Sequence, residues 1–185
     1  MTDVVLAAVL GVLGGIVLSV LLLLARRLAR GAADLGSDAE QAALTALHQA
    51  SLAAPHLRAG LSAPDVVKAA RHLRVLLGSA AVAIVSAEGT VSFDGPSDGL
   101  ESAARRIAAQ VSASGRRQVF PARGRDGELE AVGAPILVDG RVVGVVVAFA
   151  ASVRAALVRA AEEVADWCAA QVELGGLDAS RTQLA

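Results

Sequence analysis

Aromatic side chains are scarce in this chain of 185 residues, and it has no excess of positive charge. Phe, Trp and Tyr together make up 2% of the chain, tyrosine is absent, and the formal net charge is −1. A nucleic-acid-binding protein needs a basic surface for the phosphates and, for single strands, aromatic faces on which bases stack. The composition therefore predicts no nucleic-acid partner.

Cysteine is also nearly absent. Cys168 is the single cysteine, so no internal disulfide can form, which is typical of a protein in a reducing compartment. It follows Trp167 in a segment with helical periodicity. We expect a small buried residue at this position rather than a redox switch.

Residues that carry phosphate or metal chemistry are few. Phosphoryl transfer needs a glycine-rich phosphate loop with a basic residue and a metal ligand. The only lysine, Lys68, lies in a predicted helix, and no Gly-Lys-Ser/Thr sequence occurs. His48, His56 and His72 are too widely spaced for a His-x-x-x-His ligand pair. We predict no catalytic residue and no metal site in this chain.

Hydrophobic side chains are in excess, at 55% of the chain, and the mean hydropathy is +0.57. Residues 4–25 carry no charge, and as a helix they would measure about 33 Å, enough to cross a hydrocarbon core of about 30 Å. Arg26 and Arg27 follow the run directly. The residues before it include the acidic Asp3 and no basic residue. The positive-inside rule predicts a single-pass anchor over residues 1–30 in the cell membrane, with the N-terminus outside and the rest cytoplasmic.

A cleaved signal peptide is the alternative for this segment. Its basic residues would precede the apolar core, and that core is usually about 7–15 residues long, so we expect the segment to remain in the membrane. Gly11 and Gly15 have the GxxxG spacing that lets two membrane helices approach closely, which favours a homodimer. Glycine is also frequent in membrane helices without such a role, and that alternative stays open.

The rest of the chain alternates between helical and strand patterns. Ser37 with Glu40, and Ser62 with Asp65, have the spacing of a capping box, and each pair predicts the start of a helix. An α+β fold with a central antiparallel sheet flanked by helices accounts for the order of elements, and we expect the helices on one side of the sheet. The predicted helices are 37–57, 63–77, 97–115 and 152–174, and the predicted strands are 80–86, 90–94, 117–122, 128–138 and 141–150.

Residues 132–150 form the longest apolar stretch in the second half of the chain, interrupted by Asp139 and Gly140. Each half is far too short to cross a membrane as a helix, and its valine content favours a strand. Asp-Gly is the preferred sequence for a tight two-residue turn. The stretch therefore predicts a buried β-hairpin at the centre of a soluble sheet.

The last predicted helix carries an apolar repeat at alternating steps of four and three residues, the period of a coiled coil. Pairing with a second subunit and packing on the sheet both explain the repeat, and both alternatives stay open. Gly175 and Gly176 are expected to interrupt the helix before another one begins, and we expect the natural polypeptide to continue past residue 185. The repeat includes Val153, Leu157, Val164 and Trp167, which we interpret as a signalling helix.

Two parts of the sequence resemble a known family. VGAPILVDGRVVGVVVAFA, with a proline entering one strand and a glycine in a valine-rich strand, resembles the corresponding hairpin of GAF domains. Residues 46–78 and 174–185 resemble the segments that bracket the GAF domain in actinobacterial LytS-like sensor histidine kinases. The resemblance covers most of residues 40–185, although that family usually has several membrane helices. It implies an anchor over 1–30, a linker or signalling helix over 31–60, a GAF-like sensory domain over 61–174 and the start of an output helix over 175–185.

The resemblance implies the sensory region of a membrane-bound two-component histidine kinase, working as a homodimer. In that family the phospho-accepting histidine and the ATP-binding module follow this region, and neither lies in this chain. ATP and Mg²⁺ would be cofactors of that downstream core alone, and the response regulator its partner. Histidine-kinase ATP sites hold the metal through an asparagine, and this chain has none. The alternative is a stand-alone membrane-tethered GAF module for dimerisation or scaffolding, without a ligand.

The same resemblance places a small-molecule pocket between the sheet and the helix and loop that cross it. We expect Phe93, Ile107, Phe120 and Val132 to line it, with Arg123 in an arginine-rich loop at its mouth. That loop suits an anionic ligand, with a simply solvated loop as the alternative. A methionine sulfoxide reductase on this fold would need several reactive cysteines, and a single cysteine argues against that enzyme.

Overall fold

The computed structural model describes residues 40–96, 99–122 and 129–183. The predicted anchor over residues 1–30, with Gly11 and Gly15, lies outside them. In the part of the chain that is described, no helix is both long and apolar enough to cross a bilayer. The contacts of the chain divide it after Thr45, and the compact unit from Ala46 onward holds the sheet and its helices. Of the first unit, residues 40–45 are described, and they are helical.

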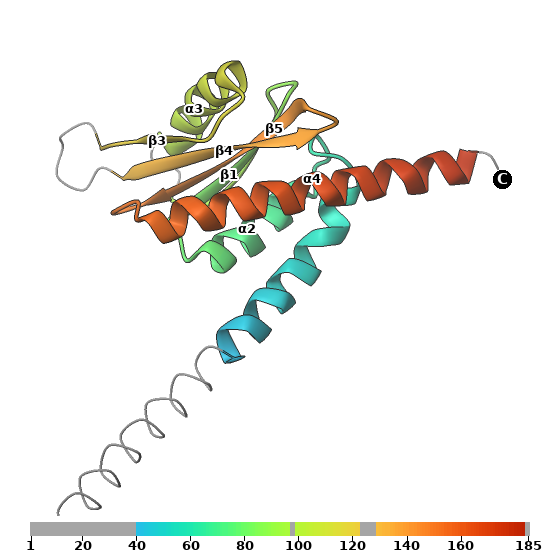
Figure 1. Cartoon of the computed structure of the whole chain (residues 1–185), viewed down its shortest axis with the longest axis horizontal. Coiled ribbons are helices and arrows are strands. Elements are labelled where there is room, and N and C mark those ends of the chain that lie inside the picture. Colours follow the sequence, from blue (N-terminus) through green and yellow to red (C-terminus); the bar gives the residue numbers. More distant parts are fainter. Residues whose placement is uncertain (1–39, 97–98, 123–128, 184–185) are drawn as a thin grey trace, which may run out of the picture. The chain divides into compact units, whose positions relative to one another are not determined.

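A five-stranded sheet in the order β2-β1-β5-β4-β3 forms the centre of this unit (Figure 1), and every neighbouring pair is antiparallel. β1 is buried along its whole length, as its continuous apolar sequence predicts. The short β3 lies at an edge, as predicted from Pro121, which follows it and has no N–H for a ladder. The strands are β1 (Ala81–Ser86), β2 (Val91–Asp94), β3 (Gln118–Phe120), β4 (Glu130–Val138) and β5 (Arg141–Ala150).

The predicted hairpin is confirmed as β4 and β5, with β5 in the middle of the sheet. Its turn consists of Asp139 (φ 50) and Gly140 (φ 74), both in the left-handed region. Positive φ at both central residues is the requirement of a type I′ turn, whose twist matches that of the flanking strands. The hydrophobic stretch over residues 132–150 is therefore a β-hairpin whose strands are largely buried at the centre of the sheet.

Helices cover both faces of the sheet, whereas the sequence led us to expect one. α3 (Leu100–Ser114) lies on one face, and α2 (Val66–Leu77), α4 (Ala155–Gln183) and the helical residues 46–58 pack on the other (Figure 1). Alternate residues of the central strands enter the two cores. A sheet that is apolar on both faces has to be covered on both, which explains why the strands read as unbroken apolar runs. The α3 core includes Val145, Val147 and Phe149, and the opposite core includes Val146, Ala148 and Cys168.

Two glycines inside the strands allow neighbouring elements to approach closely. A Cβ on Gly133 would lie 2.7 Å from Cγ2 of Val111, so α3 packs directly over β4 at this point. A Cβ on Gly144 would lie 2.6 Å from Cδ1 of Leu61 and 2.8 Å from the carbonyl oxygen of Val85. The glycine within the valine-rich strand is thus required by packing on the α2 and α4 side of the sheet.

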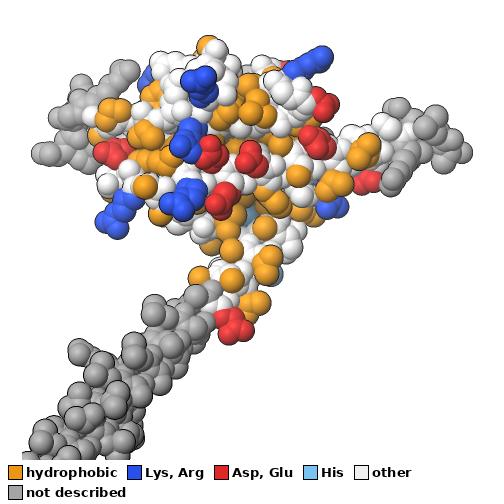
Figure 2. All heavy atoms as spheres, viewed as in Figure 1, with side chains coloured by type: hydrophobic (Ala, Val, Ile, Leu, Met, Phe, Trp, Pro, Cys, Tyr) orange, Lys and Arg blue, Asp and Glu red, His pale blue; other side chains and the backbone are white. Residues whose placement is uncertain are grey.

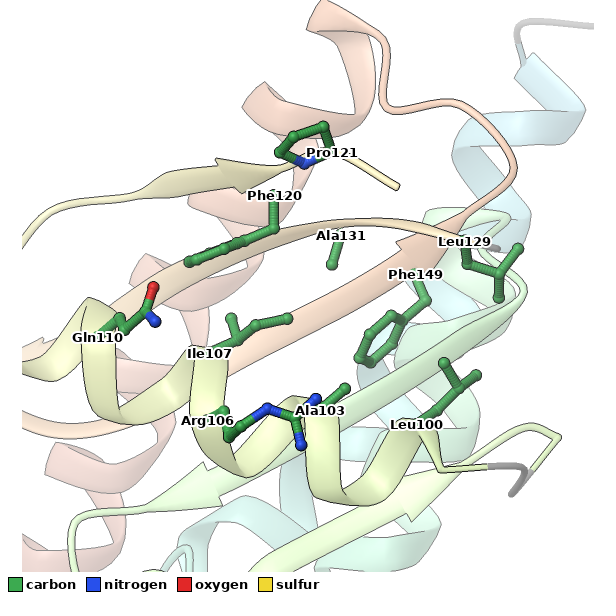
Figure 3. Close-up of a pocket in the computed structure, with 10 residues that line it drawn as sticks. All are labelled: Leu100, Ala103, Arg106, Ile107, Gln110, Phe120, Pro121, Leu129, Ala131 and Phe149. Atoms are coloured by element: carbon green, nitrogen blue, oxygen red, sulfur yellow. The ribbon is translucent and has the colours of Figure 1, made fainter. Parts of the chain in front are cut away.

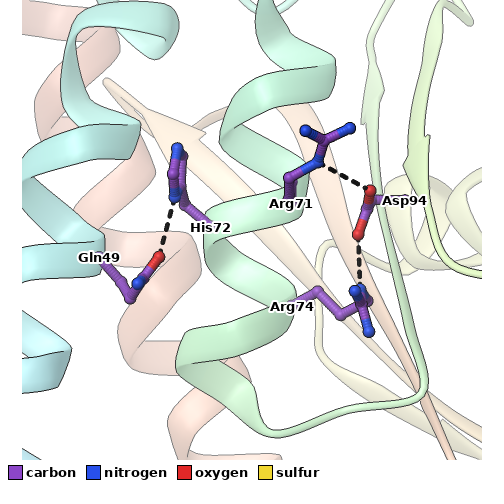
Figure 4. Close-up of polar contacts among 5 residues, drawn as sticks. All are labelled: Gln49, Arg71, His72, Arg74 and Asp94. Atoms are coloured by element: carbon purple, nitrogen blue, oxygen red, sulfur yellow. Dashed lines mark hydrogen bonds and ion pairs between the residues drawn. The ribbon is translucent and has the colours of Figure 1, made fainter.

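Polar contacts tie α2 to its neighbours (Figure 4). Asp94 of β2 accepts from Nε of Arg74 at 2.5 Å and from Nε of Arg71 at 3.4 Å. Nδ1 of His72 lies 2.8 Å from Oε1 of Gln49 in the preceding helix. These contacts hold the helix at both sides of its apolar stripe.

The start of α2 differs from the prediction. α2 begins at Val66, with Asp65 as its N-cap residue and no side-chain hydrogen bond at the cap. Ser62, predicted to cap the helix, instead donates its hydroxyl to Oε2 of Glu88 at 2.8 Å. Turn hydrogen bonds from Ala63 to Gly60 and from Val66 to Ala63 occupy this segment, so the hydroxyl lies too early for the cap.

The predicted interruption of the last helix is wrong, because α4 runs without a break from Ala155 to Gln183 through Gly175 and Gly176. Gly175 faces the backbone of the helix over 46–58: a Cβ at this position would lie 2.0 Å from the carbonyl oxygen of Arg58. The glycine therefore serves a close helix crossing and does not end the helix. Whether residues 175–185 begin an output segment stays a prediction.

Candidate ligand pocket

A pocket of about 180 Å³ opens between α3 and the sheet, and we call it the α3 pocket (Figure 3). Its walls come from one side of α3 and from β3, β4 and β5, together with the residues that flank β3 and β4. Its lining is predominantly apolar, which is typical of small-molecule sites. The lining residues are Leu100, Ala103, Arg106, Ile107, Gln110, Phe120, Pro121, Leu129, Ala131 and Phe149.

The pocket exists because a small residue stands between two large ones on the same face of the sheet. Ala131 of β4 is the register partner of Phe120 in β3 and of Phe149 in β5. Directly opposed residues of an antiparallel pair point to the same side, so these three side chains form one row under α3. The missing side-chain volume at Ala131 leaves the depression between the two rings.

α3 supplies its wall through helical periodicity. Ala103, Ile107 and Gln110 follow at steps of four and three, and Arg106 lies beside them on the same flank. The helix ends at Ser114, and its C-cap residue Gly115 adopts the left-handed conformation (φ 63) and donates its backbone N–H to the carbonyl oxygen of Val111. Gly133, which lacks a side chain, brings this helix close to β4.

Two polar side chains line the α3 pocket, Arg106 and Gln110. Nη1 of Arg106 donates to Oγ of Ser102 at 3.4 Å, a long hydrogen bond. The neighbouring Arg105 does not line the pocket and pairs with Glu101 at 3.6 Å on the exposed side of the helix. The pocket thus offers one cationic group and one amide against apolar walls.

The structure brings two of the five residues predicted for a ligand pocket into the α3 pocket. Ile107 and Phe120 line the α3 pocket, and Phe93 packs against the same core without reaching the lining. Val132 lies instead on the opposite face of β4, in the core under α2 and α4, because its neighbour Ala131 occupies the pocket face. Arg123 lies outside the described residues, so its expected place at the pocket mouth stays a prediction.

Sequence reasoning missed most of the remaining wall. Helical spacing along α3 signals both polar residues, because Gln110 follows Ile107 by three residues and Arg106 follows Ala103 by three. No local sequence pattern predicts Phe149 or Leu129 in the pocket. Phe149 lies there because β5 pairs with β4, and Leu129 because it directly precedes β4. A strand that is apolar on both faces gives no alternation from which its pocket side could be chosen.

The residues predicted as a signalling stripe pack within the chain. Val164 is buried in the core beneath α4, and Val153, Leu157 and Trp167 are half-buried against it. Packing on the sheet therefore explains this part of the repeat. Beyond the sheet, Leu174 and Leu177 of α4 are exposed, at 44% and 58%. Figure 2 shows acidic and basic side chains interspersed with apolar ones on the visible face of the molecule.

Cys168 lies in the core under α4, on the side of the sheet opposite the α3 pocket. Burial raises the pKa of its thiol to about 12. Because the thiolate is the nucleophilic form, a buried thiol with such a pKa is inert at neutral pH. Among the described residues, no group of histidines, cysteines and carboxylates is arranged to hold a metal ion.

A larger hollow of about 400 Å³ lies at the edge of β4, past the end of β3. Pro135 lines it and has no N–H to offer an incoming strand. Arg117 and Glu162, also in its lining, form an ion pair with each other. Arg116 and Asp166 line it as well, so its basic and acidic side chains balance. Without a charge that favours a ligand of either sign, this hollow is a weaker candidate for a ligand than the α3 pocket.

No protein-family model and no curated protein sequence matches this chain. Among solved structures, the free methionine-R-sulfoxide reductase of Neisseria meningitidis in complex with its substrate aligns with a TM-score of 0.53 and 19% identity, covering 75% of this chain and 93% of that chain. The nlh2 GAF domain of A. aeolicus in an inactive state aligns with a TM-score of 0.50 and 17% identity, covering 72% and 98%. At such identities the likeness concerns the fold alone, and the fold of this chain is that of a GAF domain.

Proposed function

We propose that this chain is a sensory input module, in which a small molecule bound in the α3 pocket biases the position of α4. The observation that supports the proposal is the position of β4 and β5 between the pocket and α4. One face of these two strands lines the pocket, and the other face packs against α4. Ala131 and Phe149 face the pocket, and their chain neighbours Val132 and Ala148 face the core under α4. A ligand that moves these strands acts on both cores. Such a ligand shifts α4 only if it binds two positions of the helix with different affinity.

The N-terminal segment tethers the module in this proposal. Residues 4–25 form a single membrane-spanning helix, with the N-terminus outside and the GAF-like domain at the cytoplasmic surface. Gly11 and Gly15 form the contact of a homodimer in the membrane. Cysteine-scanning across residues 4–25 tests both points, because disulfide cross-linking with a helical period that includes position 11 and position 15 supports the dimer face.

The output of the module is a histidine kinase core that follows residue 185 in the natural polypeptide. The resemblance of residues 174–185 to sensor histidine kinases supports this part of the proposal. The core would use ATP and Mg²⁺ and would pass the phosphoryl group to a response regulator. Reading the coding sequence past codon 185 tests the point. A phospho-accepting histidine helix and an ATP-binding module support the kinase, and a stop codon excludes it.

The coupling of pocket and helix has a built-in reporter, because Trp167 is the only tryptophan and lies in α4, half-buried on the core opposite the pocket. The full chain in lipid nanodiscs would be screened against small metabolites for a rise in the midpoint of thermal unfolding. We expect any stabilising compound to shift the emission of Trp167 as well. A compound that stabilises the chain and leaves this emission unchanged contradicts the coupling.

Ala131→Leu provides the matched control for this screen. The larger side chain fills the space between Phe120 and Phe149, and Gly176→Ala serves as a substitution remote from the pocket. We expect Ala131→Leu to remove both the stabilisation and the change in emission while the chain stays folded. Gly176→Ala should retain both responses.

A scaffold without a ligand is the second candidate, and the small volume of the α3 pocket favours it. Ligand pockets commonly measure about 300–1,000 Å³, and the α3 pocket measures about 180 Å³. The module would then serve as a membrane-tethered dimerisation or spacer domain. A screen in which no compound raises the unfolding midpoint supports this candidate over the sensor.

A further inference from the structure

The described lining of the α3 pocket is apolar except for one cationic side chain and one amide. Among the described residues of its lining, Arg106 is the charged one, and Gln110, one helical turn further along α3, is the other polar side chain. Both side chains come from the helix wall, and the rings of Phe120 and Phe149 come from the strands (Figure 3). The polar groups of the described lining thus lie on α3, and its aromatic rings lie on the sheet.

The guanidinium of Arg106 has N–H donors available for a ligand. A guanidinium carries five N–H donors, and the one hydrogen bond recorded for Arg106 is the 3.4 Å contact to Ser102. Within the described residues, no carboxylate pairs with it, whereas the adjacent Arg105 pairs with Glu101 and Arg74 pairs with Asp94. A carboxylate is the natural partner of a guanidinium, because two parallel hydrogen bonds match the two groups.

The size of the pocket limits what can accompany the carboxylate. A cavity of about 150 Å³ lined by Leu, Ile and Phe accommodates benzene, and the α3 pocket measures about 180 Å³. It therefore takes one ring or one branched alkyl group, and a nucleotide is too large. A phosphate monoester would bring a second negative charge that the described lining residues do not compensate.

We propose that the α3 pocket binds a small monocarboxylate with an aryl or branched-alkyl body. The carboxylate pairs with Arg106, the amide of Gln110 supplies a further hydrogen bond, and the body contacts Phe120 and Phe149. This inference rests on the proposed function, since it requires that the α3 pocket be a ligand site. It adds the chemical class of the ligand and the residue that selects it.

The test compares acids with neutral molecules of the same shape. Phenylacetate and 3-methylbutanoate, with 2-phenylethanol and 3-methylbutanol as their neutral counterparts, would be titrated against the full chain in lipid nanodiscs by saturation-transfer NMR. Empty nanodiscs give the blank. We expect each acid to bind at least about 10-fold more tightly than its alcohol, which corresponds to about 1.4 kcal/mol.

Substitutions at neighbouring positions of α3 show which arginine is responsible for the preference for acids. We expect Arg106→Gln to weaken binding of the acids at least about 10-fold and to leave the alcohols unchanged. Arg105→Gln, on the exposed side of the same turn, should leave all four affinities unchanged. Arg106→Lys keeps the positive charge but loses the two parallel N–H donors of the guanidinium, and it should give an intermediate affinity for the acids. The unfolding midpoint of each variant shows whether its fold is intact.

Three results would overturn the inference. Alcohols that bind as tightly as their acids, or acids that bind the Arg106→Gln and wild-type chains equally, would leave a ligand pocket of a different class, and the sensory proposal would stand. Absence of binding by all four probes also overturns the inference. The sensory proposal itself fails when the broader screen yields no stabilising compound, or when a stabilising compound leaves the emission of Trp167 unchanged.

Discussion

Gly175 of α4 lies against the carbonyl oxygen of Arg58, so closely that a Cβ on the glycine would be 2.0 Å from that oxygen. One turn earlier in α4, the buried Gln171 accepts a hydrogen bond at 3.1 Å from Nε of Arg58. α4 thus contacts both the backbone and the side chain of Arg58, which lies at the end of the helix over 46–58. This crossing fixes the chain that leads into the domain against the chain that leaves it.

Gly175→Ala should disrupt this crossing. The obstacle is a backbone oxygen, which no rotamer change can remove, so the helices have to separate at a cost of about 1–3 kcal/mol. Gly176→Ala is the matched control, because nothing lies within 4 Å of a Cβ at Gly176. Alanine there should stabilise the helix by about 1 kcal/mol. Thermal unfolding followed by Trp167 fluorescence measures both, and equal shifts for the two variants would contradict the crossing.

Asp94→Asn should loosen α2 from β2. The Asp94 side chain is 15% exposed and accepts from Arg74 and Arg71, whose own side chains are 37% and 67% exposed. Solvent screening limits the effect, and we expect a loss of about 1 kcal/mol in the free energy of unfolding. Arg74→Ala should cost more than Arg71→Ala, since its contact is shorter and less exposed. The reverse order in urea unfolding would show that this ion-pair geometry does not govern stability.

Sequence patterns were sufficient for the order of the elements after residue 60 and for the hairpin turn at Asp139 and Gly140. They failed where a tertiary contact decides the role of a residue. A pair of glycines ordinarily ends a helix, yet α4 continues because Gly175 meets Arg58 from a distant part of the chain. Local propensity carries no information about such a partner.

The candidate pocket was predicted only in part for a similar reason. Ile107 follows from the periodicity of α3, and Phe120 from its position in an edge strand. We expected Val132 in the lining, whereas its smaller neighbour Ala131 lies there and Val132 is buried in the opposite core. Which face of β4 carries Ala131 depends on its pairing with β3 and β5, and that register is not encoded within the strand itself.

Gly133 and Val111 should behave as a coupled pair. A Cβ on Gly133 would lie 2.7 Å from Cγ2 of Val111, a stiff β-branched side chain packed in the α3 core. We expect Gly133→Ala to destabilise the domain by about 1–3 kcal/mol and Val111→Ala to cost a similar amount through its cavity. In the double variant the new methyl group enters that cavity, so the combined loss should be smaller than the sum by about 1 kcal/mol. Additive losses in a double-mutant cycle would show that α3 does not pack on β4 at Gly133.

His72 should make the stability of the domain depend on pH near neutrality. Partial burial lowers the pKa of its imidazole, and the nearby His56, Arg71 and His48 lower it further. Its Nδ1 meets Oε1 of Gln49, and no carboxylate among the described residues contacts the ring. The unfolded chain therefore binds a proton at this residue more readily than the folded chain does. The stabilisation is complete above the unfolded pKa of about 6.5 and is lost as the pH falls below it, toward the lower folded pKa.

Comparison of His72→Gln with the unaltered chain isolates this contribution. We expect the midpoint of thermal unfolding to fall between pH 7.5 and 5.5, and to fall less in His72→Gln, because glutamine cannot take up the proton. His48→Gln is the comparison variant: it leaves the Gln49 contact in place and removes only the smallest of the charges that lower the His72 pKa, so its pH profile should stay close to that of the unaltered chain. A pH profile that is identical in His72→Gln and the unaltered chain would place the titrating group elsewhere. The midpoint difference between the two chains, plotted against pH, reports the protonation of this one imidazole, because all other titrating groups are common to both.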